Sequence, residues 1–231
     1  MSEADLTRTA IVTGGTGGLG AAVVRRLREA GWRVVVPWVA ERELERVERG
    51  EGLELVQADL FDEQAVSEVA RVAGDSTRAV VNLVGGFAAG GRVHETSIDE
   101  LEGQLRLNLR AAWLVTAAAI PAMLAAGEGS IVCVSSRTAL KPFSGGAAYA
   151  ISKRAVLGLV DALDVEYAGD GIRANAILPS VIDTPANRTS MPDADPAEWV
   201  TPEQIAATIE FLVSPAAAAT SGAHIPVYGR A

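Results

Sequence analysis

The sequence predicts a doubly wound α/β fold, in which a parallel sheet of about seven strands carries helices on both faces. Short β-branched runs alternate with longer stretches of helical periodicity along the whole chain. Three of the runs are apolar almost throughout, which is typical of strands covered on both faces. No Pro-, Gly- or Ser-rich linker and no repeat divides the 231 residues. We therefore expect residues 1–231 to form a single domain.

Each expected element follows from its local pattern. Apolar, β-branched runs predict strands at Thr9–Thr13, Arg33–Val36, Leu53–Val56, Ala79–Val84, Ser130–Val134, Arg173–Leu178 and Ile225–Val227. Apolar positions three or four residues apart predict helices at Leu19–Ala30, Glu41–Arg49, Asp62–Val72, Ile98–Ala126 and Tyr149–Ala168. Because strands and helices alternate, right-handed crossovers would bring the strands into parallel pairing.

The segment Thr184–Pro202 interrupts this alternation. It contains four prolines, so it cannot form one long regular element. It follows the strand Arg173–Leu178, and ligands of open α/β sheets bind at the carboxyl ends of the strands. We expect residues 184–202 to form a substrate lid, with a plain surface connection as the alternative.

Composition and charge restrict the partners. The chain has 20 Lys and Arg against 29 Asp and Glu, a net charge of −9, which argues against nucleic acid or a membrane surface as a partner. With one cysteine, Cys133, and two distant histidines, no disulfide and no metal site are expected. Met1–Thr9 is charged, and no apolar run reaches roughly 18 residues, so we expect a cytoplasmic protein.

Glycines dominate the turn Thr13–Gly20 between the first strand and its helix. Residues without Cβ let the chain turn sharply and bring N–H groups close to a pyrophosphate at the positive end of the helix. The glycines fit two registers, G-x-G-x-x-G from Gly15 and T-G-x-x-x-G-x-G from Thr13. No Gly-Lys-Ser/Thr follows, so this is not a P-loop. The turn predicts a dinucleotide bound to a Rossmann-type sheet.

The residue that ends the second strand is Trp38, where dinucleotide-binding sheets commonly place a carboxylate for the ribose 2′-hydroxyl. The first acid after it is Glu41. Either Glu41 reaches back to the ribose, or the site lacks the carboxylate that would repel a 2′-phosphate, which Arg42 could then bind. Trp38 either packs on adenine or simply ends the strand. On balance the sequence slightly favours NADP(H) over NAD(H).

A second cluster predicts proton-transfer chemistry. Tyr149 and Lys153 are four residues apart and would share one face of a helix, where the ammonium is expected to lower the pKa of the phenol. Ser136, after a strand, can donate a hydrogen bond to a carbonyl oxygen. Together they suit proton transfer to an oxygen that gains negative charge as hydride reaches its carbon. Asn108 lies inside a helix, where asparagine is not favoured.

These motifs resemble those of the short-chain dehydrogenase/reductase family, from Thr9 to Gly229, in the T-G-x-x-x-G-x-G register. The resemblance implies an NAD(P)(H)-dependent oxidoreductase that interconverts a carbonyl and an alcohol. Asn108, Ser136, Tyr149 and Lys153 match the family's catalytic tetrad. Tyr149 would be the acid/base and Ser136 would polarise the carbonyl. Lys153 would tune the tyrosine and bind the nicotinamide ribose, and Asn108 would hold the water of a proton relay.

The resemblance also implies the cofactor contacts, with no metal. The phosphates would be bound by Gly14, Thr16, Gly18, Leu19 and Gly20. Adenine would meet Trp38 or the pair Asp59 and Leu60, and the central strand would be supported by Asn82 and Gly85. The nicotinamide would be flanked by Tyr149, Lys153, Pro179, Ile182 and Thr184, with Thr184 near the carboxamide.

The second half has a finer resemblance. Val84–Gly90 and Ile182–Asp195 are similar to the matching stretches of dihydropteridine reductase, whose members tend to lack the serine present here as Ser136. The expected substrate is therefore a small carbonyl or alcohol, or a pteridine-like molecule. It is expected to be apolar or aromatic because such side chains would meet at the crevice mouth, namely Phe87, Leu140, Phe143, Met191 and Trp199.

Family members commonly form tetramers through two long helices, here Ile98–Ala126 and Tyr149–Ala168. The alanine-rich faces at Ala111–Ala112 and Ala117–Ala119 would allow close helix packing, so we expect a homo-oligomer, either a tetramer or a dimer. An alternative to the enzyme is a dinucleotide-binding sensor or scaffold without chemistry. A third possibility is lyase or epimerase chemistry on the same scaffold.

Overall fold

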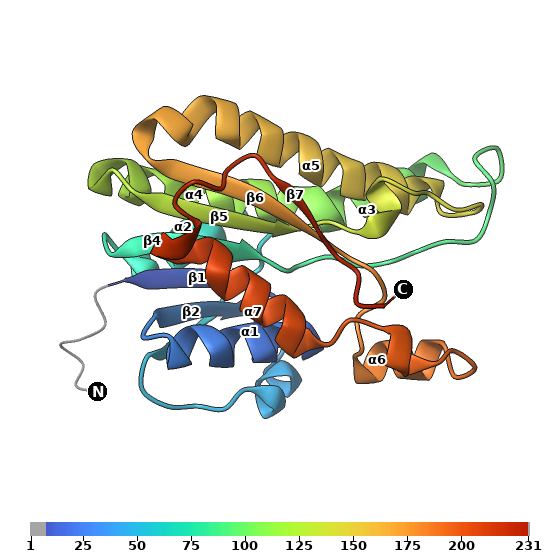
Figure 1. The fold of residues 1–231 in the computed structure, drawn as a ribbon, viewed down its shortest axis with the longest axis horizontal. Coiled ribbons are helices and arrows are strands. Elements are labelled where there is room, and N and C mark those ends of the chain that lie inside the picture. The colour runs from blue at the N-terminus through green and yellow to red at the C-terminus, as the bar shows by residue number, and fades with distance from the viewer. Residues whose placement is uncertain (1–7, 231) are drawn as a thin grey trace.

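Seven parallel strands form one sheet in the order β3-β2-β1-β4-β5-β6-β7, as the computed structural model of the chain shows (Figure 1). The structure describes residues 8–230. The strands are β1 (Thr9–Thr13), β2 (Arg33–Trp38), β3 (Leu53–Gln57), β4 (Thr77–Asn82), β5 (Gly129–Val134), β6 (Ile172–Pro179) and β7 (His224–Val227). The predicted fold class is confirmed, and the strand order reverses between β1 and β4.

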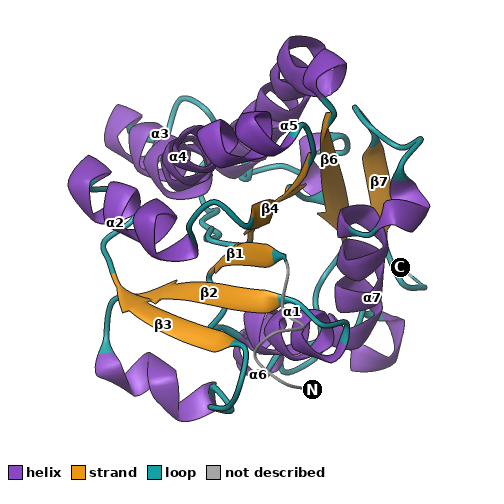
Figure 2. Ribbon diagram, turned by 90° about the vertical axis from the view of Figure 1, so that its left-hand side faces the viewer, coloured by secondary structure: helices purple, strands orange, loops and turns teal. Residues whose placement is uncertain are grey.

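Helices cover both faces of the sheet, as Figures 1 and 2 show. They are α1 (Gly18–Glu29), α2 (Glu63–Ala73), α3 (Ile98–Leu105), α4 (Ala111–Ala126), α5 (Ala147–Tyr167), α6 (Pro185–Ser190) and α7 (Pro202–Val213). Helices α1 and α7 pack together on one face, and α2, α4 and α5 lie on the other. The central strands are largely apolar because each of their two side-chain sets enters a different core. In β1, for example, Ile11 belongs to the core under α2, α4 and α5, whereas Ala10 and Val12 belong to the core under α1 and α7.

Three elements differ from the sequence analysis. The expected helix Glu41–Arg49 is a short 3-10 helix, Glu41–Arg46. Helix α7 was not expected, although Thr201 and Gln204 form a capping box around Pro202, which is a recognised start signal. The segment 184–202 consists of α6 and a 3-10 turn at Pro196–Glu198, and a parallel bridge between Ile182 and Val200 joins its two ends.

The continuous helical stretch Ile98–Ala126 has 29 residues, and an 18-residue window within it has a mean hydropathy of 1.6. By length and composition alone it could cross a membrane, although no uninterrupted apolar run in it reaches roughly 18 residues. A buried core helix passes the same test, and the α4 part of this stretch packs on β4, β5 and α2.

Candidate active site

The carboxyl ends of β1 and β4 meet where the strand order reverses, the place where open α/β sheets bind their ligands. The Thr13 hydroxyl accepts hydrogen bonds from the backbone N–H groups of Leu83 (3.1 Å) and Val84 (3.4 Å). A Cβ on Gly14 would lie 3.2 Å from the Val84 nitrogen. The glycine-rich turn and the loop after β4 are therefore in direct contact along this edge.

The turn has the properties of a phosphate site. Gly14 has a φ of +67°, and a Cβ on Gly20 would lie 2.0 Å from the Gly14 carbonyl oxygen, so both positions require glycine. This pair supports the T-G-x-x-x-G-x-G register. Gly17 begins α1 without a side-chain cap, which leaves the N–H groups of the first turn for an anion. These residues fit a dinucleotide pyrophosphate.

Helix α5 begins two residues before Tyr149 and places Tyr149 and Lys153 one turn apart. Ser136 follows β5 and caps a 3-10 turn, with its hydroxyl accepting from the Thr138 N–H at 3.1 Å. Burial raises the pKa of Tyr149, and a hydrogen bond with the Ser136 side chain acts in the opposite direction. The three predicted groups therefore lie together.

The expected lowering of the Tyr149 pKa by Lys153 is wrong for this structure, because burial of the phenol dominates. The Lys153 ammonium donates to the backbone oxygen of Val134 at 3.1 Å. The Lys153 residue is only 5% exposed, and burial lowers its pKa to about 8. At neutral pH most of the molecules therefore carry an ammonium inside the site.

Asn108 lies in a π-helical turn, Arg106–Arg110, that joins α3 to α4. Its Oδ1 accepts from the Gly86 N–H at 3.0 Å. Its Nδ2 donates to the Gly86 oxygen (3.1 Å), Gln104 Oε1 (3.1 Å) and Ser152 Oγ (3.0 Å). Single π-turns inside α-helices are frequent at functional sites. The Nδ2 hydrogens are engaged by protein partners, so the side chain holds the loop after β4 against α5, and Oδ1 keeps a second acceptor position. Its expected part in a proton relay stays a prediction.

Gly85 lies beside the side chains of Asn108 and Lys153, two of the four predicted catalytic residues. A Cβ at this position would lie 2.6 Å from Asn108 Oδ1 and 2.9 Å from Lys153 Nζ. Only glycine lets the loop after β4 pass this close to both groups. The sequence analysis included Gly85 as a cofactor contact; the structure adds this packing role beside the ammonium.

Aromatic side chains surround the phenol. Phe87 packs edge-on against Tyr149 with ring centroids 5.0 Å apart, and stacks on Phe143 at 6.3 Å. Phe87 is 65% exposed, and Leu140 and Phe143 are exposed as well. Trp199, in contrast, is buried and its backbone packs against Gly229, so its expected place at the mouth is wrong.

The first residues of segment 184–202 lie directly on the glycine-rich turn. A Cβ on Gly18 would lie 3.2 Å from Thr184 Cγ2, and Thr184 caps α6. The base of the segment is pinned by Asn187 Nδ2, which donates to the Ile182 oxygen at 2.8 Å. Arg188 binds both carboxylate oxygens of Asp183, at 2.6 and 2.8 Å. Thr184 therefore lies next to Gly18, at the start of α1.

The other predicted cofactor residues differ in exposure and in hydrogen bonding. Asn82 Nδ2 donates to Thr116 Oγ1 at 3.0 Å, which ties β4 to α4 as expected of a supporting residue. The Asp59 carboxylate accepts from the Phe61 N–H at 2.9 Å and stays exposed. The Leu60 side chain is part of the core, so only its backbone can meet a ligand. Pro179 is the buried last residue of β6.

The Glu43 carboxylate contacts the glycine-rich turn. Its Oε2 accepts a hydrogen bond from Thr16 Oγ1 at 3.1 Å. From the sequence we expected either Glu41 or no carboxylate near the adenosine ribose. In the structure Glu43, not Glu41, contacts the turn. Trp38 Nε1 is buried and has no hydrogen-bond partner among residues 8–230, which leaves a donor for a bound ligand.

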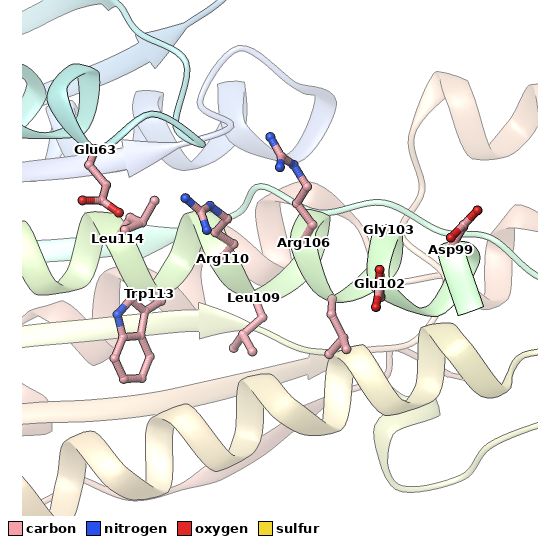
Figure 3. Close-up of a pocket in the computed structure, with 10 residues that line it drawn as sticks. Glu63, Asp99, Glu102, Gly103, Arg106, Leu109, Arg110, Trp113 and Leu114 are labelled. Carbon is pink, nitrogen blue, oxygen red and sulfur yellow. The ribbon is translucent and has the colours of Figure 1, made fainter. Parts of the chain in front are cut away.

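Two cavities lie away from this edge, on the α3–α4–α5 side. One, of about 730 Å³, is lined by Glu63 of α2 and by residues of α3, α4 and the π-helical turn between them, including Arg106, Arg110 and the exposed Trp113, which Figure 3 labels. The other, of about 280 Å³, lies between α4 and α5. Within residues 8–230, no three His, Cys, Asp or Glu side chains are grouped as metal ligands.

Comparison with known proteins agrees with this geometry. A sequence model described as short chain dehydrogenase matches residues 8–195. The chain belongs to the short-chain dehydrogenase family. A solved short-chain dehydrogenase/reductase family protein superimposes with a TM-score of 0.88 at 30% identity, with 97% of each chain covered. The family has NAD(P)-dependent oxidoreductase members, and this chain is an oxidoreductase of that type.

Two curated relatives show how widely substrates vary within the family. The 2-(R)-hydroxypropyl-CoM dehydrogenase of Xanthobacter autotrophicus is 31% identical, over 97% of this chain and 98% of the relative. The cis-4-hydroxycyclohexanecarboxylate dehydrogenase of Sinomonas cyclohexanicum is 33% identical, over 99% and 98%. A solved structure from Beutenbergia cavernae, titled a putative NAD(P)-dependent gluconate 5-dehydrogenase with bound NADP, has 32% identity, covers 97% of this chain and 96% of its own, and has a TM-score of 0.85.

Gly85→Ala tests the contact between the loop and the tetrad. The added Cβ must displace Asn108 or Lys153, and misplacement of catalytic groups by about 1 Å can lower turnover about a hundredfold. Gly90→Ala, in the same loop, is the matched control because its Cβ would meet nothing within 4 Å. Steady-state kinetics on both folded variants measures the effect. Equal activities in the two would show that Gly85 has no such role.

Proposed function

We propose that this chain interconverts a small carbonyl compound and its alcohol with NAD(P)(H), using Tyr149 as the general acid/base. The observation that carries the proposal is the meeting of Ser136, Tyr149 and Lys153 beside the glycine-rich turn. The two curated relatives named above are dehydrogenases of hydroxyl compounds, which supports the carbonyl–alcohol pair.

The bound nicotinamide would supply hydride to the carbonyl carbon in reduction, or accept it from the alcohol carbon in oxidation. Ser136 donates a hydrogen bond to the substrate oxygen, where negative charge develops. Tyr149 transfers its phenolic proton to that oxygen, which yields the alcohol and a phenolate. The Lys153 ammonium stabilises this phenolate by its charge, and Asn108 positions the loop beside it. In oxidation the phenolate takes the proton back.

The raised pKa of Tyr149 sets the direction of the pH effect. Reduction needs the protonated phenol, which is the dominant form at neutral pH. Oxidation needs the phenolate, whose fraction grows as pH rises toward the pKa of Tyr149. The site therefore suits reduction near neutrality, and oxidation should gain from rising pH until Lys153, whose pKa is about 8, loses the charge that stabilises the phenolate.

The substrate we propose is apolar or aromatic. Phe87 and Phe143 present exposed rings beside the phenol, and Leu140 extends this apolar surface. A flat ring would stack there while its carbonyl faces Tyr149 and Ser136. The expected likeness of the second half to dihydropteridine reductase stays a prediction, so a dihydropteridine belongs in the substrate panel beside aryl and alkyl ketones.

We also propose that the chain forms a homo-oligomer through α4 and α5. Trp113 and Leu124 on α4 and Val165 on α5 are large apolar side chains that are 57%, 42% and 85% exposed. Ala111, Ala112 and Ala119 pack inside the chain's own core, so the expected alanine faces are available only at Ala117 and, in part, Ala118. The contact would depend on Trp113 and its neighbours.

Tyr149→Phe removes the transferred proton and leaves the ring in place. Turnover is expected to fall at least about a hundredfold in both directions, the scale of a lost acid/base. Tyr167→Phe, at the end of the same helix, is the matched control. Near-normal turnover of Tyr149→Phe would refute the mechanism. Cofactor binding by the wild-type protein without turnover of any panel member would favour the sensor or scaffold alternative instead.

Phe87→Ala tests the substrate class. Loss of the stacking ring, worth about 0.5–1.5 kcal/mol beyond buried area, should raise KM for an aryl ketone about tenfold. KM for an alkyl ketone of similar size should change less. Phe211→Ala, on the exposed side of α7, should change neither. Equal losses with both ketones would count against an aromatic substrate.

Trp113→Glu tests the oligomer, since a charge in a buried apolar contact is unfavourable. Light scattering after size-exclusion chromatography should show a dimer or tetramer for the wild-type protein and a smaller species for the variant. Phe211→Glu places the same charge on α7 and should leave the mass unchanged. A monomeric wild-type protein would contradict the proposal.

A further inference from the structure

The contact between Thr16 and Glu43 places a carboxylate at the adenosine end of the expected cofactor site. Thr16 lies in the glycine-rich turn and is only 6% exposed. Glu43 comes from the 3-10 helix that follows β2, and its Oε2 accepts from Thr16 Oγ1 at 3.1 Å. The 3-10 helix after β2 and the glycine-rich turn before α1 are thereby joined through a negatively charged side chain.

In a dinucleotide-binding sheet, this position is close to the ribose next to adenine. The pyrophosphate lies on the α1 N-terminus, and the ribose next to adenine lies between the turn and the end of β2. A carboxylate at that point accepts a hydrogen bond from the ribose 2′-hydroxyl. It also repels a 2′-phosphate, which an arginine would instead attract. The charge that faces the turn therefore decides which dinucleotide binds.

Glu43 remains able to accept a further hydrogen bond. A carboxylate has about four acceptor positions, and Thr16 uses one of them. The threonine thus fixes the orientation of the carboxylate without saturating it. Trp38, at the end of β2, adds a buried Nε1–H that has no acceptor among residues 8–230, which a polar atom of a ligand would satisfy.

The neighbouring charges do not replace Glu43 in this role. Glu41 and Arg42, the two residues considered from sequence, are exposed. Within the described part of the chain, neither side chain makes a hydrogen bond or ion pair with the glycine-rich turn, whereas Glu43 does. The group that faces Thr16 is negative.

We propose that Glu43 selects the cofactor: its carboxylate binds the 2′-hydroxyl of the adenosine ribose and excludes a 2′-phosphate, so this chain uses NAD(H) in preference to NADP(H). Thr16 is the positioning residue for that carboxylate. The inference rests on the proposed function only in that a nicotinamide dinucleotide binds this turn. It replaces the slight preference for NADP(H) expected from the absence of a carboxylate at Trp38.

Binding of NADH and NADPH to the purified protein, measured side by side by nicotinamide fluorescence, tests the assignment without any substrate. The wild-type protein should bind NADH at least about tenfold more tightly than NADPH. Glu43→Gln keeps the shape and removes the charge. Since hydrogen bonds to charged groups contribute about 1.5–3 kcal/mol, the ratio of the two dissociation constants should shift about 10- to 100-fold toward NADPH.

Glu41→Gln is the matched control, because it removes the same charge two residues away and should leave the ratio unchanged. Arg42→Ala should also leave it unchanged. Tighter binding of NADPH by the wild-type protein, an unchanged ratio in Glu43→Gln, or a loss of NADPH affinity in Arg42→Ala would each overturn the inference. Absence of binding by both nucleotides would overturn the proposed function together with it.

Discussion

A buried ammonium organises the reactive end of the sheet. Lys153 is almost fully buried and has one backbone oxygen, that of Val134, as its hydrogen-bond acceptor among the described residues. A charge in this position is costly unless other groups are arranged around it, and its lowered pKa reflects that cost. The loop after β4 and helix α5 both lie close to this ammonium. The loop after β4 passes beside it because Gly85 has no side chain, and α5 begins just early enough to place Tyr149 one turn away.

The polar network around Asn108 connects this ammonium to the rest of the fold. The π-helical turn between α3 and α4 brings the Asn108 amide inward, where it joins Gly86 in the loop after β4 to Ser152 in α5. Ser135 adds a second link, since its hydroxyl donates to the backbone oxygen of Lys153 at 2.7 Å. Three elements that are distant in sequence are thus fixed relative to one another. Proton transfer depends on distances of this accuracy, so the network serves catalysis through geometry.

The two ends of the crevice differ in chemistry. At one end a carboxylate faces the glycine-rich turn, and at the other the exposed ring of Phe87 packs against the phenol with Phe143 stacked behind it. Relatives that are 31–33% identical over nearly the full chain have names with very different substrates. Such variation is expected when relatives share a scaffold and differ in the loop residues that line their sites.

The amino-acid sequence by itself determined the alternation of strands and helices, the glycine-rich turn and the helical spacing of Tyr149 and Lys153, because each of these depends on local pattern. It also contained the capping box of α7, a local signal that was overlooked. Only the tertiary structure decided which carboxylate meets Thr16, that Asn108 lies in a π-turn and that Trp199 is buried. It also decided that burial of the phenol, opposed by the hydrogen bond with Ser136, raises the pKa of Tyr149. These properties arise from contacts between segments far apart in the chain. No local pattern encodes the direction of a side chain on an irregular segment or the loss of water around an ionisable group.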